Sequence, residues 1–226
     1  MTLQEVLHTY FGYDDFRPLQ AEIIQSVLAG HDTLALLPTG GGKSICFQVP
    51  TLVMAHQNEE KRLCLVITPL IALMKDQVDN LHARGIHSAA IYTGMNWDKQ
   101  RVALDNCQYG PYHFLYCSPE RLESEEFRKR LAQLPIGLIA VDEAHCISEW
   151  GHDFRPEYRK IRSIVEEIGV APIIALTATA TPKVQSDIQK NLSMSDAKVF
   201  KDSFNRKNLY YEIRDKADPK RDIIKY

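Results

Sequence analysis

A short glycine-rich segment carries the strongest chemical signal in the chain. It reads LPTGGGKS, Leu37–Ser44, and directly follows the apolar run TLALL. Glycines allow a tight turn whose backbone N–H groups converge on phosphate oxygens, and the dipole of a following helix favours the same negative charge. Lys43 would then reach the terminal phosphates of a nucleotide and Ser44 would ligate Mg²⁺. The strict GxxxxGK[ST] pattern fails at its first glycine, where Leu37 stands, so the alternative is a glycine-rich turn with a chance lysine.

An acidic pair forms the second signal. The segment VDEAH, Val141–His145, ends the apolar run GLIAV. An acid at the carboxyl end of a parallel strand faces the crevice where α/β sheets bind ligands. Asp142 would hold Mg²⁺, largely through water, and Glu143 would orient and deprotonate an attacking water. The alternative is an acidic cluster that caps a helix, but the upstream GGGKS favours nucleotide hydrolysis.

Two threonines form a weaker third signal. Thr177 and Thr179 lie in ALTATA, after the run PIIAL, and would place hydroxyl groups beside the same crevice. They could equally cap a helix that starts at Pro182. The residue types alone do not decide between these roles.

The elements that must position these residues are predicted from short apolar runs. The runs do not alternate with polar residues, which is typical of strands covered on both faces of a parallel sheet. They are Thr33–Leu37, Leu63–Thr68, Ser88–Tyr92, His113–Tyr116, Gly137–Val141 and Pro172–Leu176. Amphipathic segments lie between them, including Ile71–Arg84 and Glu157–Ile168, and a helix is expected over Pro18–Leu28. The alternation predicts an α/β fold with a doubly wound, mainly parallel sheet and an N-terminal helical segment.

Composition places limits on function. The chain has 226 residues, a formal net charge of -2 and an isoelectric point near 6.4. Many nucleic-acid-binding domains are strongly basic, so any claim of nucleic-acid binding must depend on motifs. No apolar run is long enough to span a bilayer, and the N-terminus lacks the pattern of a signal peptide. We therefore expect a soluble intracellular protein with no membrane partner, bacterial and cytoplasmic rather than nuclear.

The five cysteines show no CxxC spacing. Most of them lie in apolar, strand-like surroundings, so we expect buried, reduced thiols rather than a zinc site or a disulfide framework. They are Cys46, Cys64, Cys107, Cys117 and Cys146.

The ordered set of motifs resembles the superfamily-2 helicases. It comprises PTGGGKS, TPLIALMKDQV (Thr68–Val78), SPERL (Ser118–Leu122), DEAHCISEWGHDFRPEYR (Asp142–Arg159) and ALTATA. The stretch after DEAH, together with FGYDDFRPLQ (Phe11–Gln20) and FNRKNLYY (Phe204–Tyr211), is similar to the RecQ family in particular. The resemblance covers nearly the whole chain and implies the first, RecA-like P-loop lobe of a DNA helicase.

The resemblance also implies roles for residues of a nucleotide site. Arg17 and Gln20 match the family's adenine-recognising motif, and a glutamine amide has both the donor and the acceptor that the edge of adenine requires. The implied nucleotide contacts are Arg17, Gln20, Thr39, Gly40, Gly41, Gly42, Lys43 and Ser44. The implied catalytic residues are Lys43, Asp142, Glu143 and His145, and the implied metal ligands are Ser44 and Asp142.

A DNA-binding role is implied for three segments. The loop His145–Arg159 resembles the aromatic-rich loop that senses single-stranded DNA in RecQ proteins, and Trp150, Phe154 and Arg155 are its candidate contacts. The alternative is that Trp150 and Phe154 are buried anchors. Pro69, Leu70, Lys75 and Arg121 lie in segments expected to follow the DNA backbone, although Lys75 could equally be a solvated helix residue.

The expected organisation is one ATP-binding lobe over residues 1–203, and a linker with the start of a second lobe over 204–226. That tail contains a strand candidate, Leu209–Ile213. In the family the second lobe carries an arginine that accelerates phosphoryl transfer by roughly 10³–10⁵. The implied function is an ATP- and Mg²⁺-dependent 3′-to-5′ DNA helicase, with this lobe binding ATP but not unwinding DNA alone. A motor that does not separate strands, a nucleotide-gated binding module and an RNA helicase are the alternatives.

Overall fold

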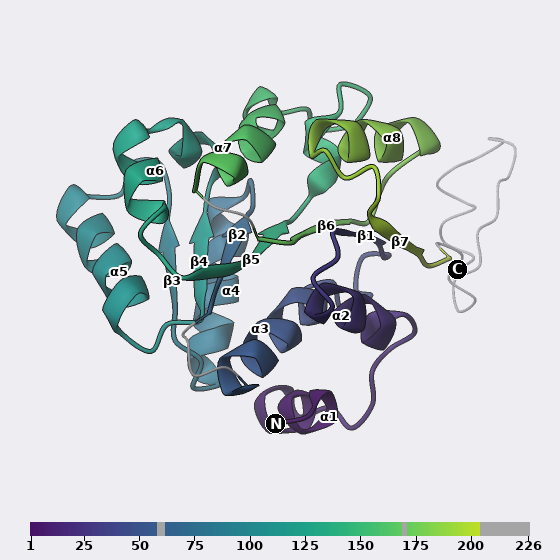
Figure 1. Ribbon diagram of the computed structural model, residues 1–226, viewed down its shortest axis with the longest axis horizontal. Helices are drawn as coiled ribbons and strands as arrows, with labels where there is room; N and C mark the ends of the chain where they lie inside the picture. The colour runs from purple at the N-terminus through teal and green to yellow at the C-terminus, as the bar shows by residue number, and fades with distance from the viewer. Residues whose placement is uncertain (58–61, 169–170, 204–226) are drawn as a thin grey trace, which may run out of the picture.

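The fold is built on one seven-stranded parallel sheet. The computed structural model describes residues 1–57, 62–168 and 171–203 (Figure 1). The strand order is β3-β4-β2-β5-β6-β1-β7, and every neighbouring pair is parallel. The strands are β1 Thr33–Leu36, β2 Leu63–Ile67, β3 Ser88–Ile91, β4 Phe114–Cys117, β5 Ile136–Val141, β6 Ile173–Thr177 and β7 Lys198–Lys201.

The predicted fold class is therefore confirmed, and the six predicted strands end within one residue of the observed ones. The seventh strand, β7, was not predicted. It lies at the edge of the sheet beside β1 and most of its side chains are exposed, so its sequence KVFK carries no apolar run. The predicted strand Leu209–Ile213 lies outside the described residues.

The helices connect the strands and cover both faces of the sheet. They are α1 Leu3–Val6, α2 Gln20–Leu28, α3 Ile45–Gln57, α4 Ile71–Ala83, α5 Trp97–Tyr109, α6 Glu125–Leu131, α7 Ile161–Ile168 and α8 Pro182–Asn191. Shorter turns are the π-helical η1 Leu7–Phe11 and the 3₁₀ turns η2 Pro119–Glu123, η3 Ala144–Ile147 and η4 Pro156–Lys160.

Two helix boundaries differ from the prediction. The helix expected from Pro18 begins at Gln20, because Leu19 adopts a left-handed conformation with φ of 66°. The helix expected over Glu157–Ile168 is divided into η4 and α7, since the chain turns at Pro156 before it enters the regular helix. The predicted helix Ile71–Arg84 is confirmed as α4.

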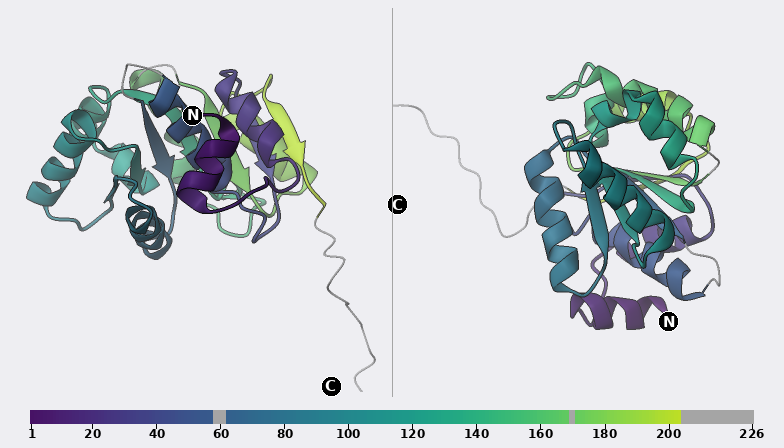
Figure 2. Two further views of the ribbon diagram at one scale, coloured as in Figure 1. Left: turned by 90° about the horizontal axis from the view of Figure 1, so that it is seen from below. Right: turned by 90° about the vertical axis from the view of Figure 1, so that its left-hand side faces the viewer.

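Two apolar layers sandwich the sheet. Successive strand residues point to opposite faces, so Leu34 and Leu36 pack under α5–α8 while Ala35 and Leu37 pack under α1–α4. Figures 1 and 2 show the helices on the two sides. Because both faces are covered, β1, β2, β4 and β6 are buried at every position, which explains their continuous apolar runs.

All five cysteines are buried, as expected. Burial raises the pKa of Cys46, Cys64, Cys117 and Cys146 to about 12, which keeps these thiols protonated and poorly reactive. Within the described part of the chain, no helix is long and apolar enough to cross a bilayer.

The parallel arrangement brings the chemical motifs to one edge. The carboxyl ends of parallel strands meet at the same edge of a sheet, where α/β folds place their ligand sites. The segment after β1 is the glycine-rich loop, the segment after β5 begins with Asp142, and Thr177 ends β6. Because β5, β6 and β1 are neighbours, these three segments must lie side by side.

Candidate functional site

The glycine-rich loop has backbone geometry that requires its glycines. Gly40 and Gly42 have φ of 79° and 77°, in the left-handed region that side chains disfavour. A Cβ atom on Gly41 would lie 2.8 Å from the Pro38 carbonyl, and one on Gly42 would lie 2.3 Å from Nε2 of Gln20. The three consecutive glycines are therefore structural requirements rather than a chance composition.

Leu37 explains why the strict phosphate-loop pattern fails at its first position. Its side chain is buried and its N–H donates to the Thr177 carbonyl at 3.1 Å, so the residue continues the pairing of β1 with β6. The tight turn begins only after Pro38, where the Gly41 N–H donates to the Pro38 carbonyl at 2.9 Å. The loop is a shortened form of the strict motif.

One cavity of about 600 Å³ collects most of the predicted nucleotide site. Its volume lies within the range of ordinary small-molecule pockets. Eight of the predicted site residues line it: Arg17, Gln20, Gly40, Gly42, Lys43, Ser44, Asp142 and Glu143. Thr39 instead lines a neighbouring cavity of about 230 Å³, together with Glu143 and His145.

Arg17 and Gln20 brace the glycine-rich loop. The Arg17 guanidinium donates to the Gly40 carbonyl, and Nε2 of Gln20 donates to the Gly42 carbonyl at 3.1 Å. Oε1 of Gln20 accepts from the Arg17 backbone N–H at 2.8 Å, and the side chain is buried. Both ends of the Gln20 amide are thus engaged by the protein, so a base that hydrogen-bonds to Gln20 must exchange with these contacts.

Asp142 lies at the point where β5 ends. Its N–H donates to the Ile67 carbonyl at 2.9 Å, and its own carbonyl accepts from the Tyr158 hydroxyl at 3.0 Å. Burial, with a smaller contribution from neighbouring Glu143, raises the pKa of Asp142 to about 6, while Lys43 acts in the opposite direction. A carboxylate held in this way favours a nearby cation.

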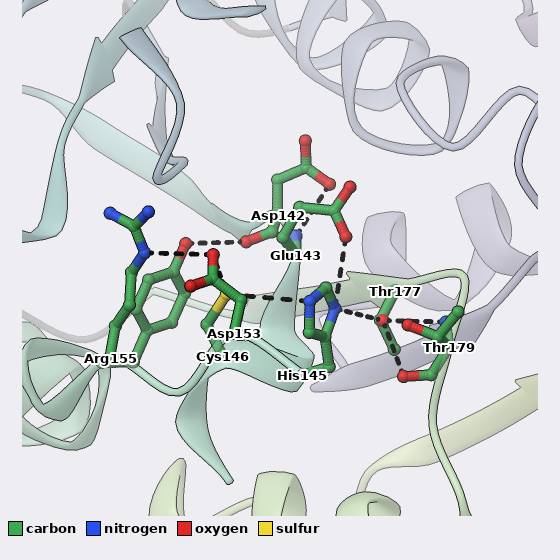
Figure 3. Close-up of polar contacts among 9 residues, drawn as sticks. Asp142, Glu143, His145, Cys146, Asp153, Arg155, Thr177 and Thr179 are labelled. Atoms are coloured by element: carbon green, nitrogen blue, oxygen red, sulfur yellow. Dashed lines mark hydrogen bonds and ion pairs between the residues drawn. The ribbon is translucent and has the colours of Figure 1, made fainter. Parts of the chain in front are cut away.

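Glu143 adopts a strained backbone conformation. Its φ of 49° and ψ of 43° are left-handed, which is costly for a residue with a Cβ and is typical of functional sites. Its carboxylate lies 3.3 Å from Nδ1 of His145 (Figure 3). The hydrogen bond to His145 lowers the pKa of Glu143, so the carboxylate remains ionised and able to accept a proton.

A polar chain links Glu143 to the end of β6. Nδ1 of His145 also lies 2.9 Å from the Thr177 hydroxyl, which accepts from the Thr179 N–H at 3.2 Å (Figure 3). The helix-capping role considered for the two threonines belongs to Thr181, whose hydroxyl accepts from the Val184 N–H at 3.4 Å. Thr177 therefore positions His145.

The aromatic-rich loop exposes its tryptophan. The Trp150 side chain is 66% exposed, and the Lys183 ammonium of α8 lies 3.4 Å from the centre of its ring. Such exposure contradicts the alternative of a buried anchor. The preceding Ser148 donates to Asp187 of α8 at 2.5 Å and accepts from the Trp150 N–H at 3.2 Å, so α8 holds the loop.

The same loop also contacts the polar chain around His145. The His152 ring stacks on His145 with 4.1 Å between centroids. Phe154 is half-buried, and the Arg159 guanidinium lies 4.9 Å from its ring centre. A displacement of the loop would therefore change the packing of the His145 ring.

The other candidate DNA contacts differ in accessibility. Leu70 and Lys75 are exposed, whereas Pro69 is buried. Arg155 is held by Asp153 at 3.3 Å and by the Pro69 carbonyl at 3.4 Å. Arg121 donates to Oε1 of Gln100 at 2.6 Å. The two arginines must exchange protein contacts if they are to meet a phosphate.

Two residues of the cavity were not identified from the sequence. Gln77 of α4 donates to the Ser44 hydroxyl at 3.1 Å and accepts from Nε2 of Gln48 at 3.2 Å, so it orients the candidate metal ligand. Tyr13 is an exposed aromatic residue that lines the cavity beside Arg17 and Gln20. The available signals were that Gln77 falls within TPLIALMKDQV and Tyr13 within FGYDDFRPLQ.

Comparisons with known proteins agree with this geometry. Residues 17–188 match the DEAD/DEAH box helicase family. The probable ATP-dependent DNA helicase RecS of Bacillus subtilis is 42% identical over 217 residues, which cover 96% of this chain and 42% of RecS. The ATP-dependent DNA helicase RecQ of the same organism is 44% identical over 93% of this chain and 35% of its own length. The chain thus spans less than half the length of these relatives.

A third relative carries a different description. The putative ATP-dependent RNA helicase R290 of Acanthamoeba polyphaga mimivirus is 42% identical over 225 residues, covering 98% of this chain and 40% of its own length. Among solved structures, the DUF1998 helicase MrfA bound to DNA aligns with a TM-score of 0.70 at 18% identity, covering 88% of this chain and 27% of MrfA. That structural likeness shows a shared fold.

Asp142→Asn is expected to stabilise the metal-free chain at neutral and higher pH. The folded-state pKa of about 6 lies above the ordinary value of about 3.9, so the folded state binds more protons between these values and its stability falls as pH rises. Asparagine carries no such penalty. The gain in the free energy of unfolding should be about 1–3 kcal/mol above about pH 6 and should disappear near pH 4.

Urea unfolding at the two pH values measures this gain. The exposed carboxyl of Asp79, on α4, supplies the matched control Asp79→Asn. A gain of the same size at both pH values would contradict the raised pKa of Asp142.

Proposed function

Because this chain belongs to the DEAD/DEAH box helicase family, we propose that it is the ATP-binding lobe of a RecQ-like motor that uses ATP hydrolysis for 3′-to-5′ movement along DNA and for unwinding. One observation carries the proposal. A single cavity is lined by the phosphate loop, by the acidic pair after β5 and by Arg17 and Gln20. These are the groups needed to hold the phosphates, activate water and contact the base.

The phosphate end of the cavity is formed by the loop and the start of α3. Lys43 supplies a positive charge for the terminal phosphates, and the backbone N–H groups near the N-terminus of α3 favour the same anions. Ser44 and Asp142 are hard oxygen donors, which fit Mg²⁺. A bound Mg²⁺ would neutralise charge that develops on the phosphates.

The water-activating end is formed by Glu143. Its ionised carboxylate can accept a proton from an attacking water. His145 fixes that carboxylate at 3.3 Å and is itself positioned by Thr177. We therefore assign Glu143 as the general base and His145 as the residue that connects it to β6.

The base end is formed by the N-terminal segment. Arg17, Gln20 and the exposed ring of Tyr13 line the cavity on this side. We assign Gln20 to the adenine edge and Tyr13 to stacking on the base. Entry of the base then exchanges the contacts of Gln20 with the glycine-rich loop for contacts with ATP.

Coupling to nucleic acid is assigned to the loop that bears Trp150. Its exposed ring can stack on an unpaired base, and its His152 stacks on His145. Movement of the loop on binding DNA would therefore reach Glu143 through His145. A DNA substrate is favoured over RNA because the RecS and RecQ relatives are named DNA helicases.

Turnover is expected to need the second lobe. An arginine supplied in trans commonly accelerates phosphoryl transfer by roughly 10³–10⁵. We therefore expect the 226-residue chain alone to bind ATP and hydrolyse it slowly, and the complete protein to act as the DNA motor.

Glu143→Gln in the complete protein should retain ATP binding and lose hydrolysis by about 10²–10⁴-fold, because an amide cannot accept the proton of the attacking water. Steady-state phosphate release with saturating single-stranded DNA measures the loss, and titration with a fluorescent ATP analogue verifies binding. Exposed Glu22 on α2 provides the control Glu22→Gln. Turnover within tenfold of the unmodified protein would exclude Glu143 as the base.

Gln77→Met should raise the Mg²⁺ concentration needed for half-maximal ATP binding by roughly two- to tenfold, the worth of one hydrogen bond. Methionine has a similar length but cannot donate to Ser44, so the hydroxyl loses its orientation. ATP affinity without Mg²⁺ should not change. The exposed Gln25 of α2 provides the control Gln25→Met. An equal loss of affinity with and without Mg²⁺ would argue against a role through the metal ligand.

A further inference from the structure

An exposed tryptophan begins α5, far from the aromatic-rich loop in sequence. Trp97 is 59% exposed, although tryptophan is normally among the more buried residues. The chain has two tryptophans, Trp97 and Trp150, and both are exposed. None of the roles assigned above explains the exposure of Trp97.

Trp97 forms one wall of a small cavity of about 190 Å³ between α5 and α6. The apolar floor is Leu104 and Phe127, and Arg101, Arg121 and Arg130 also line the cavity. This volume is below the roughly 300–1,000 Å³ of pockets that hold whole small molecules. It suits a single nucleobase or phosphate group that belongs to a longer ligand.

Two of the three arginines beside this cavity are weakly paired or have no ion pair among the described residues. Arg101 lies 5.8 Å from the Trp97 ring centre and has a weak ion pair of 3.9 Å with Asp98. Arg121 donates to the neutral Gln100, and among the described residues no carboxylate forms an ion pair with Arg121. Its buried Nε has no hydrogen-bond acceptor in that same part of the chain.

Three carboxylates, Asp98, Asp105 and Glu126, lie beside the three arginines, but they do not pair with them equally. Arg130 is paired with Asp105 at 2.5 Å, so it contributes little free charge. Glu126 is the carboxylate among the residues that line the cavity. Arg101, and Arg121 once it exchanges its hydrogen bond to Gln100, are therefore the cations that a ligand can engage.

The strand order places this cavity on the same edge as the aromatic-rich loop. Neighbouring strands β3, β4, β2 and β5 are followed at their carboxyl ends by Trp97, Arg121, Leu70 and Trp150, respectively. Figure 1 shows α5 beyond β3, at the end of the sheet away from α8. The loops that bear the two tryptophans therefore emerge from the same edge of the sheet.

We propose that Trp97, Arg101 and Arg121 form a second contact site for single-stranded nucleic acid, with the Trp97 ring stacking on an unpaired base and the two arginines meeting phosphates. This inference rests on the proposed nucleic-acid motor. A stacking aromatic face with adjacent cations is the chemistry by which single strands bind without sequence preference. A duplex keeps its base faces covered, so it cannot use the Trp97 ring in this way.

The two tryptophans allow each site to be observed separately. In Trp150→Phe, Trp97 is the one remaining tryptophan and reports its own environment by fluorescence. In Trp97→Phe, Trp150 is the one reporter. Both rings are exposed, so neither exchange should disturb the core. Titration of each variant of the 226-residue chain with a long oligothymidylate should quench both reporters over the same concentration range.

A matched pair of truncations tests the energetic role. Trp97→Ala should weaken binding of the oligothymidylate by roughly five- to 150-fold, as expected for one lost stacking contact. The control is Tyr109→Ala, at the opposite end of α5 and 80% exposed. The two positions are about 18 Å apart along the helix, so the control should bind normally.

The outcomes separate this inference from the proposed function. Quenching of Trp150 without quenching of Trp97 overturns the second site and leaves the motor assignment standing. If neither tryptophan is quenched while the chain still binds ATP, the nucleic-acid part of the proposed function fails and this inference fails with it. Stronger quenching of Trp97 by polyglutamate than by oligothymidylate would identify an acidic polypeptide as the ligand and overturn the nucleic-acid site.

Discussion

The parallel direction of all seven strands is the constraint on which the site depends. It forces the segments after β1, β5 and β6 to emerge together, and the adjacency of these strands brings Lys43 close to Asp142 and Thr177 close to His145. The same constraint buries both faces of the sheet. The glycine-rich loop and the acidic pair, from distant parts of the sequence, therefore line one cavity, and the end of β6 lies beside them.

Two residues at this edge of the sheet, Asp142 and Glu143, lower the stability of the folded chain. Glu143 holds a left-handed backbone conformation, and the buried Asp142 has a raised pKa. The surrounding structure holds both in place: the Asp142 carbonyl accepts from buried Tyr158, and the following turn is packed in the core through Ala144 and Ile147. Strained residues held by an apolar frame are typical of sites arranged for chemistry rather than for stability.

Much of the fold and part of the site could be predicted from the sequence. Buried strands can be predicted from their continuous apolar runs. The strand β7 has no such run, because its edge position leaves KVFK largely exposed. The loop and the acidic pair carry their own spacing signals. Gln77 and Tyr13 fall within quoted motifs, but their places in the cavity arise only when α4 and the N-terminal segment pack against the sheet. Likewise, residue type alone cannot show that Arg155 and Arg121 are held by other side chains.

The contact between Lys183 and Trp150 makes the aromatic-rich loop one-sided. With the ammonium 3.4 Å from the ring centre, the face of the indole toward α8 is already occupied. A planar ligand can approach only from the opposite face, and α8 acts as a wall behind the ring. Only one face of the Trp150 ring is therefore open to a base. Stacking by itself has no preferred direction, and the Lys183 contact gives this surface one.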